Sequence, residues 1–213
     1  MEKKQKIIPM TSTNTFTCSP LVMKRKFIYN NMVRFDTIAD GSCFFHAVLM
    51  SFYEPYQLNN IDRISFVREF RRDLAKTLSS PINPNDGESP SYYDALSGGT
   101  LSKFAESVPQ YSLSKMVKIL DSNSFVGNEY IEYISNLFSR DIYILDIEKS
   151  NVYMTGDEYG LLYKNRQSTV IGYKNSHFEL IGVQSSNGHI RVGFSPDDPF
   201  ISYINKTMEN NMK

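Results

Sequence analysis

Two cysteines and three histidines are the side chains with the clearest potential for chemistry in this chain of 213 residues. Cys43 lies in the stretch DGSCFFHAV, and His46 follows it three positions later. A cysteine thiolate is a strong nucleophile, and a histidine can take the thiol proton and later give it to a leaving amine. Cys43 could therefore act in acyl transfer. Its position alone favours a packing role, because free cysteines are among the most buried residues.

The neighbours of Cys43 suit a reactive thiol. Cys43 begins a predicted helix that runs to Tyr53, and the N–H groups at a helix N-terminus stabilise a thiolate. The preceding Asp40, Gly41 and Ser42 form a turn that contains glycine, so backbone N–H groups can converge near the sulfur. Such groups could hold the oxyanion that forms during acyl transfer.

Three histidines compete for the role of base. His46 shares a helix face with Cys43, and we expect its ring to pack against a neighbour rather than face a cleft. His177 opens the predicted strand HFELIGV, and strand alternation places Glu179 on the same side. A carboxylate in that position can orient an imidazole as the third member of a triad. His189 follows the turn SSNG and is interpreted as a surface residue.

Other classes of site find little support in the sequence. The chain has no phosphate-binding loop, dinucleotide fingerprint or HExxH motif, and its histidines and cysteines lack metal-ligand spacing. We therefore expect no metal and no cofactor. Two cysteines make no disulfide framework, and the chain shows neither a signal-peptide core nor an apolar run long enough for a membrane span. These features predict a cytoplasmic protein.

The elements that must position these residues fall into two groups. An amphipathic helix is predicted within IDRISFVREFRRDLAKTLSS, capped by Asp62, and further helices within residues 92–108, 112–123 and 127–141. The apolar face of the first of these helices is Ile64, Val67, Phe70, Leu74 and Leu78. The β-rich runs DIYILDI, NVYMT, STVIGY, HFELIGV and HIRVGF come later, before a closing helix within DDPFISYINKTM. This segregation predicts an α+β fold with a mostly antiparallel sheet flanked by helices.

The charges divide the chain into an arm and a body. The whole chain has 23 basic and 23 acidic residues, so its net charge gives no argument for nucleic acid. Its first 34 residues nevertheless contain seven basic residues against one acidic residue. We expect residues 1–26 to form a basic, flexible arm and residues 27–213 to form a single domain that includes a C-terminal extension.

Two distant blocks, DGSCFFHAV and NSHFELIG, together resemble the OTU (ovarian tumour) family of cysteine proteases, most of which are deubiquitinases. The blocks lie about 130 residues apart, in the order that the family shows. The segment FVGNEYIEYISNLFSRDIYILD is similar to the family's middle helix and strand, which carry a glycine beside the substrate channel. The resemblance covers roughly residues 33–183 and is closest in character to members from large DNA viruses or intracellular bacteria.

The resemblance implies roles for individual residues within a papain-like OTU fold. Cys43 would be the nucleophile, His177 the general base and acid, and Asp40 a shaper of the oxyanion loop. The third catalytic residue is commonly Asp or Asn, so Glu179 and Asn175 are rival orienting groups for His177. The residues implied to contact substrate are Gly41, Ser42, Phe125, Gly127, Asn128 and Phe178. Phe125 and Val126 stand where many members have a tryptophan.

The implied reaction is hydrolysis of an isopeptide bond after the C-terminal Gly-Gly of ubiquitin. The expected partners are ubiquitin, polyubiquitin chains or a ubiquitin-like modifier, with no membrane and no nucleic acid. We expect a monomer in the cytoplasm, which would be the host cytosol for a viral or bacterial effector. Two alternatives stay open. One is a catalytically weak ubiquitin-binding module, and the other is a structural protein tethered by its basic N-terminal arm.

Overall fold

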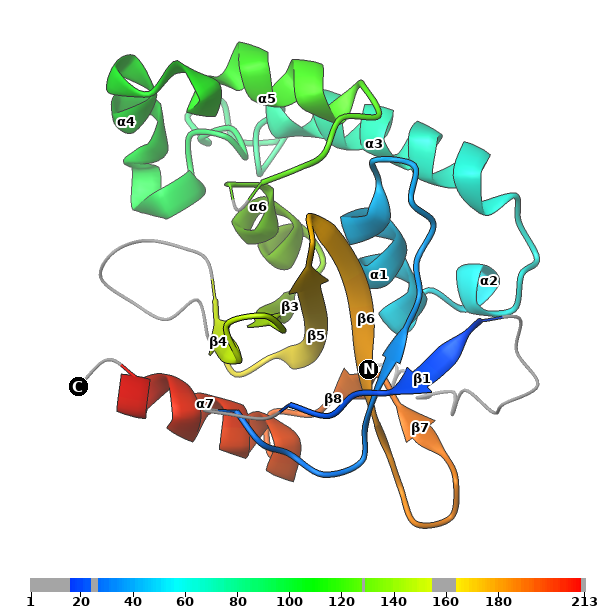
Figure 1. The fold of residues 1–213 in the computed structure, drawn as a ribbon. Coiled ribbons are helices and arrows are strands. Elements are labelled where there is room, and N and C mark those ends of the chain that lie inside the picture. The colour runs from blue at the N-terminus through cyan, green and yellow to red at the C-terminus, as the bar shows by residue number, and fades with distance from the viewer. Residues whose placement is uncertain (1–15, 24–26, 128, 155–163, 212–213) are drawn as a thin grey trace.

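The computed structural model describes residues 16–23, 27–127, 129–154 and 164–211 (Figure 1). An eight-stranded sheet lies at its centre, with the main path β1-β2-β6-β5-β3-β4, while β7 pairs with β6 and β8 with β5. The strands are β1 (Cys18–Pro20), β2 (Met32–Phe35), β3 (Arg140–Asp146), β4 (Asn151–Tyr153), β5 (Gln167–Lys174), β6 (His177–Gln184), β7 (Ile190–Arg191) and β8 (Gly193–Phe194).

Antiparallel pairing dominates this sheet, as the sequence predicts. Within the described ranges, β3 and β5 form the one parallel pair of named strands. β5 and β6 are joined by a two-residue turn, in which Asn175 and Ser176 have φ values of 50° and 59°. Positive φ at both positions marks a type I′ hairpin, whose twist matches that of the flanking strands. This tight turn sets the position of His177 at the start of β6.

Helices cover both faces of the sheet (Figure 1). They are α1 (Cys43–Phe52), α2 (Glu54–Gln57), α3 (Arg63–Leu78), α4 (Leu101–Ser107), α5 (Leu113–Leu120), α6 (Glu129–Leu137) and α7 (Pro199–Asn211), with 3₁₀ turns at Leu96–Gly99 and Pro109–Tyr111. The predicted helices within residues 92–108, 112–123 and 127–141 are thus present, and the first is interrupted near its glycine pair. A search of the described residues finds no helix with the length and apolar character of a membrane span.

Strand β3 separates two apolar cores. Ile142 and Ile144 pack into the larger core with residues of α1, α3, α5 and α6. Tyr143 and Leu145 point to the other face, into a core shared with α7. A strand covered on both faces is apolar along its whole length, which explains the run DIYILDI.

Part of the predicted arm belongs to the domain. Residues 18–20 form β1, which pairs with β2 at the edge of the sheet, and Leu21 and Met23 are buried in the core beside α7. The expectation of a flexible arm is therefore corrected for residues 18–23. A three-residue edge strand is too short to show the alternation that reveals strands in a sequence. Residues 1–15 and 24–26 lie outside the described residues.

Helix α3 contacts the loop that precedes Cys43. Its predicted cap is confirmed, because the Asp62 carboxylate accepts hydrogen bonds from the N–H groups of Ile64 and Ser65. Val67, Leu74 and Leu78 are buried as predicted, whereas Ile64 in the first turn is 43% exposed. The buried stripe also contains an arginine, Arg71, that the apolar pattern does not reveal.

Candidate active site

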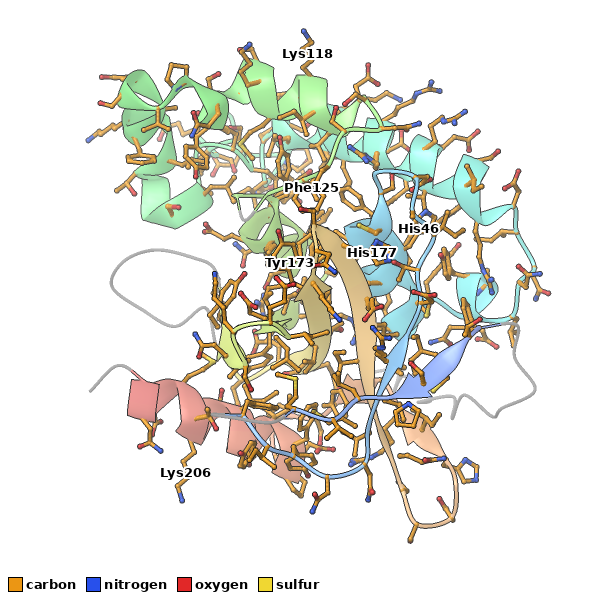
Figure 2. The ribbon with its side chains drawn as sticks, in the orientation of Figure 1. His46, Lys118, Phe125, Tyr173, His177 and Lys206 are labelled. Atoms are coloured by element: carbon orange, nitrogen blue, oxygen red, sulfur yellow. The ribbon has the colours of Figure 1, made fainter. Side chains whose placement is uncertain are left out.

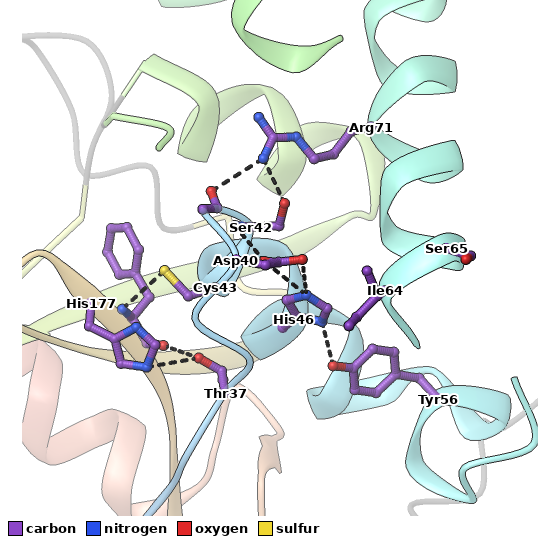
Figure 3. Close-up of polar contacts among 12 residues, drawn as sticks. Thr37, Asp40, Ser42, Cys43, His46, Tyr56, Ile64, Ser65, Arg71 and His177 are labelled. Atoms are coloured by element: carbon purple, nitrogen blue, oxygen red, sulfur yellow. Dashed lines mark hydrogen bonds and ion pairs between the residues drawn. The ribbon is translucent and has the colours of Figure 1, made fainter. Parts of the chain in front are cut away.

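Cys43 is the first residue of α1, and its thiol lies beside the start of β6 (Figure 3). The backbone N–H of Phe178 donates a hydrogen bond to Cys43 Sγ at 3.5 Å. The cysteine is only 3% exposed. The fold thus brings the predicted nucleophile next to the strand that begins with His177, although the two lie far apart in the chain.

Burial raises the pKa of the Cys43 thiol above its ordinary value. The N–H of Phe178 in β6 and those of Phe44 and Cys43 at the N-terminus of α1 lower that pKa, and the nearby Asp40 carboxylate raises it. Burial is the largest of these influences. The stabilisation of a thiolate by the helix N-terminus is therefore present but outweighed. The raised pKa favours the protonated thiol, so chemistry at Cys43 calls for a base.

Alkylation should report this raised pKa directly. In a Cys18→Ala background, the rate of Cys43 alkylation by iodoacetamide is expected to rise about tenfold per pH unit, since the thiolate is the reactive form. Burial should keep the rate rising beyond about pH 9, where an unperturbed thiol levels off. Intact mass against time at each pH gives the rate. A plateau below about pH 8 would mean that the N–H groups dominate instead of burial.

His177 is the first residue of β6, directly after the hairpin turn. Its Nε2 lies 3.2 Å from the hydroxyl of Thr37, and that hydroxyl donates a 2.5 Å hydrogen bond to the Phe178 carbonyl (Figure 3). Thr37 comes just after β2, the strand that pairs with β6. The sequence analysis missed Thr37, because no local pattern shows that these two segments meet.

Two carboxylates lie close to His177. One donor atom from each of Asp36, His177 and Glu179 lies within 4.8 Å of the others, which confirms that Glu179 is on the same side as His177. Arg34 Nη1 stands 3.2 Å from both carboxylate oxygens of Glu179. Arg34 Nε also donates to Ser19 Oγ at 3.1 Å, so the arginine is held from its other side. Glu179 is therefore paired with Arg34, and Asp36 is exposed.

The same three side chains offer one nitrogen and two oxygen donors, a set that a divalent cation could use. The linear spacing of the histidines and cysteines does not reveal this grouping, because it depends on the pairing of β2 with β6. Two of its members already have other partners, since His177 contacts Thr37 and Glu179 contacts Arg34. The expectation that the protein uses no metal stays a prediction.

Asn175 has a structural reason for its place in the sequence. It is exposed and holds the first positive-φ position of the turn between β5 and β6. Asparagine is favoured in this position of a type I′ turn. In the described part of the chain, no hydrogen bond is found between its side-chain amide and His177. Its role as an orienting group stays a prediction with less geometric support than the contact of Thr37.

The loop before Cys43 is held by a buried histidine. Asp40 Oδ1 accepts a 2.9 Å hydrogen bond from the Ser42 N–H, and the same carboxylate lies 3.3 Å from His46 Nε2. His46 Nδ1 is 2.6 Å from the Tyr56 hydroxyl, so both ring nitrogens have partners (Figure 3). Burial lowers the pKa of His46, and Asp40 opposes that change. His46 is thus a fixed support for Asp40 and not a free base, which agrees with the prediction that it packs against neighbours.

Gly41 meets the conditions that require glycine. Its φ is +85°, a region that other residues rarely adopt. A Cβ atom on Gly41 would stand 1.9 Å from the carbonyl oxygen of Asn123. The loop therefore passes in direct backbone contact with the segment that follows α5.

A Gly41→Ala variant is expected to lower kcat for the reaction proposed below by about 10- to 100-fold, because the clash moves the N–H groups near Cys43. The matched control is Gly188→Ala. Gly188 has a similar φ of +84°, but nothing lies within 4 Å of its Cβ position. Both variants should lose about 1–2 kcal/mol of stability through backbone strain alone. Equal kcat values in the two variants would contradict the importance of the contact with Asn123.

Arg71 joins this loop to α5 and the segment after it. Its Nη1 donates to the Gly41 carbonyl at 3.2 Å and to Ser42 Oγ at 2.7 Å. Its other N–H groups donate to the carbonyls of Ile119 (2.7 Å), Leu120 (3.2 Å) and Ser124 (2.8 Å). The sequence analysis missed Arg71. The available signal was a charged residue on the buried stripe of α3, four positions after Val67 and three before Leu74.

An aromatic wall stands beside the thiol. The exposed ring of Phe125 stacks on Phe178, with centroids 5.3 Å apart and planes 5° apart, and the ring centroid of Tyr173 lies 5.1 Å from that of Phe178. Figure 2 shows Phe125, Tyr173 and His177 near one end of the sheet. The predicted residues Phe125 and Phe178 thus lie together, and the N–H of Phe178 contacts the Cys43 thiol. Gly127 comes next along the same segment, and Asn128 lies outside the described residues.

Comparisons with known proteins identify the fold. No protein-family model matches this chain, and no curated protein matches it. Among solved structures, an ovarian tumor (OTU) domain in complex with ubiquitin aligns with a TM-score of 0.52 and 15% identity, over 84% of this chain and 83% of that one.

Two further structures align with lower scores. An OTU deubiquitinase from Wolbachia pipientis wMel gives a TM-score of 0.43 at 15% identity, over 75% of this chain and 95% of that one. A Hazara virus OTU bound to ubiquitin gives 0.39 at 16% identity, over 84% and 97%. The alignment above 0.5, together with the sheet and helices described, shows that this protein has the OTU fold.

Proposed function

We propose that this protein is a cysteine-dependent deubiquitinase that cleaves the isopeptide bond after the C-terminal Gly-Gly of ubiquitin. The observation that carries the proposal is the meeting of Cys43 at a helix N-terminus with the strand that begins with His177. The OTU fold supports it, because the structure with the similar fold was solved in complex with ubiquitin.

In this proposal His177 first takes the proton of the Cys43 thiol. The sulfur then bonds to the carbonyl carbon of the last glycine, and the carbonyl electron pair moves to oxygen. The oxyanion is held by backbone N–H groups of the loop that ends at Cys43. The Cys43 N–H is the best placed of these, because the Ser42 N–H is occupied by Asp40 Oδ1.

The intermediate then collapses with cleavage of the carbon–nitrogen bond, and the protonated His177 gives its proton to the leaving lysine amine. A thioester remains on Cys43. His177 takes a proton from a water molecule, whose oxygen adds to the thioester carbon, and the carbon–sulfur bond breaks. The thiolate recovers its proton, and ubiquitin leaves with a free carboxylate. Because burial raises the Cys43 pKa, removal of the thiol proton calls for a base, and His177 is the base in this proposal.

The aromatic wall supplies the proposed specificity. Phe125 is exposed and stacks on Phe178, the residue whose N–H donates to the Cys43 thiol, and in this proposal the flat aromatic surface leaves room for a tail that ends in two glycines. A bulkier C-terminal residue would meet these rings before its carbonyl reached Cys43. The proposed substrate is therefore ubiquitin, polyubiquitin or a modifier that ends in the same way.

Intact mass after incubation with ubiquitin that carries a C-terminal propargylamide tests the proposal. Wild type and Cys18→Ala are expected to gain the mass of one ubiquitin, whereas Cys43→Ala should gain none. Cys18 is the matched control, because it is the other cysteine and is exposed. Labelling of Cys43→Ala would mean that the nucleophile is misassigned. Tight ubiquitin binding without labelling of wild type would favour a ubiquitin-binding module instead.

A further inference from the structure

Thr37 lies between the imidazole of His177 and the backbone of the same strand (Figure 3). Its Oγ1 is 3.2 Å from His177 Nε2 and 2.5 Å from the carbonyl oxygen of Phe178. The pairing of β2 with β6 places Thr37 opposite this part of the strand when the register is continued past Phe35. The pairing of the two strands therefore brings the Thr37 side chain to both partners.

The proton of the Thr37 hydroxyl can serve only one of these two contacts. A hydroxyl has one hydrogen and two lone pairs, and a carbonyl oxygen has no hydrogen to offer. The 2.5 Å contact with the Phe178 carbonyl therefore uses the hydroxyl hydrogen. The Thr37 oxygen must then accept a hydrogen from the ring, so His177 Nε2 carries the proton. In a neutral imidazole this leaves the lone pair on Nδ1.

The other polar groups near His177 are less suited than Thr37 to hold the ring in one tautomer. Glu179 has both oxygens 3.2 Å from Arg34 Nη1, so its charge is already compensated. Asp36 is close but exposed, where water screens its charge. Asn175 is occupied with the shape of the hairpin turn. Thr37, by contrast, has its hydroxyl within hydrogen-bond distance of the His177 ring.

Phe178 links this arrangement to the nucleophile. Its N–H donates to Cys43 Sγ, and its carbonyl accepts from Thr37. A single residue of β6 thus fixes both the sulfur and the hydroxyl that holds the ring. A shift of Thr37 would change its contact with the His177 ring directly. It would also act on Cys43 through Phe178, which contacts both residues.

We propose that Thr37 is a positioning residue that holds His177 in the tautomer with hydrogen on Nε2, leaving Nδ1 as the base for the Cys43 thiol. This inference rests on the proposed function for its catalytic consequence. The tautomer itself is a property of the free protein and can be measured without substrate.

The ring nitrogens of His177 give the first test. ¹⁵N chemical shifts should be recorded near pH 9, where an ordinary imidazole is neutral, for wild type, Thr37→Val and Thr37→Ser, with the His177 signals assigned by their loss in His177→Ala. Wild type and Thr37→Ser should show hydrogen on Nε2 and a bare Nδ1. Thr37→Val, similar in shape but without the hydroxyl, should show a mixture of tautomers. A fixed Nε2–H tautomer in Thr37→Val would overturn the proposal.

Steady-state kinetics on an isopeptide-linked ubiquitin substrate give the second test. Thr37→Val is expected to lower kcat by about 10- to 100-fold with little change in KM, because it acts on proton transfer and not on binding. Thr37→Ser should restore most of kcat. Glu179→Gln, and Asn175→Gly, which tolerates the positive φ, should cost less than Thr37→Val. A larger loss in either would transfer the positioning role to that residue and overturn the proposal.

The two tests separate this proposal from the proposed function. If wild type does not react with ubiquitin, the proposed function fails, while the ring-nitrogen spectra still decide whether Thr37 sets the tautomer. If wild type is active and Thr37→Val keeps both its kcat and its tautomer, the function stands and the role of Thr37 fails. Circular dichroism of each variant confirms that the comparison is between folded proteins.

Discussion

Replacing His177 by alanine is expected to lower kcat/KM for isopeptide hydrolysis by about 10³- to 10⁴-fold. The reason lies in the thiol. Burial raises the pKa of Cys43, so without a base the thiolate fraction at neutral pH is very small. In the proposed mechanism the same variant also lacks the acid that protonates the leaving lysine. Release of free ubiquitin from a di-ubiquitin substrate, followed over time, measures the loss.

The other two histidines make this experiment selective. His189→Ala is the matched control, because His189 is exposed in a turn beside β7, and its activity should stay within about twofold of wild type. His46→Ala is a poor control, since it would leave Asp40 and Tyr56 without their partner in a buried network. A His177→Ala variant as active as His189→Ala would remove His177 from the mechanism.

An Arg71→Met variant is expected to lower the free energy of unfolding by about 3 kcal/mol or more. This guanidinium donates five hydrogen bonds, four of them to backbone carbonyls. Methionine fills a similar volume but donates nothing, and each buried acceptor left without a partner costs about 1–3 kcal/mol. Urea denaturation followed by circular dichroism gives the change.

Arg72→Met is the control for the loss of one positive charge from α3. Arg72 is the next residue, its side chain is 55% exposed, and its contact with Asp121 is a loose 3.9 Å. Its effect should stay within about 0.5 kcal/mol. Arg71→Lys keeps the charge but has at most three donors at a single point, so we expect an intermediate loss. Equal stability of Arg71→Met and Arg72→Met would contradict the bridging role of Arg71.

Local pattern was sufficient to predict the elements. The spacing of Val67, Leu74 and Leu78 gave α3, and the apolar run DIYILDI gave β3. Cys43 and His177 could be singled out because each is the first residue of an element, α1 and β6 respectively, directly after a turn. Their meeting could be predicted only through the resemblance, since nothing in the chain orders two segments about 130 residues apart.

The surroundings of the two residues depend on tertiary contacts that leave no local trace. Thr37 reaches His177 only because β2 pairs with β6, and Arg34 reaches Glu179 for the same reason. Strand alternation correctly placed Glu179 beside His177, but it could not show that an arginine from another strand compensates its charge. The predicted arm, residues 1–26, included the residues of β1. This three-residue strand is stabilised by its pairing with β2, and its own sequence shows no strand pattern.

The bonds of Arg71 have a consequence for how this protein can vary. Its partners in α5 and the segment after it are the main-chain carbonyls of Ile119, Leu120 and Ser124, and Gly41 likewise touches the main chain of Asn123. Main-chain contacts constrain the path of a segment and leave its side chains free. Evolution or design could therefore replace the exposed side chains at residues 121–125 to suit another modifier while the loop before Cys43 kept its shape. Insertions or deletions at residues 121–125 would change these main-chain contacts and so displace the loop that precedes Cys43.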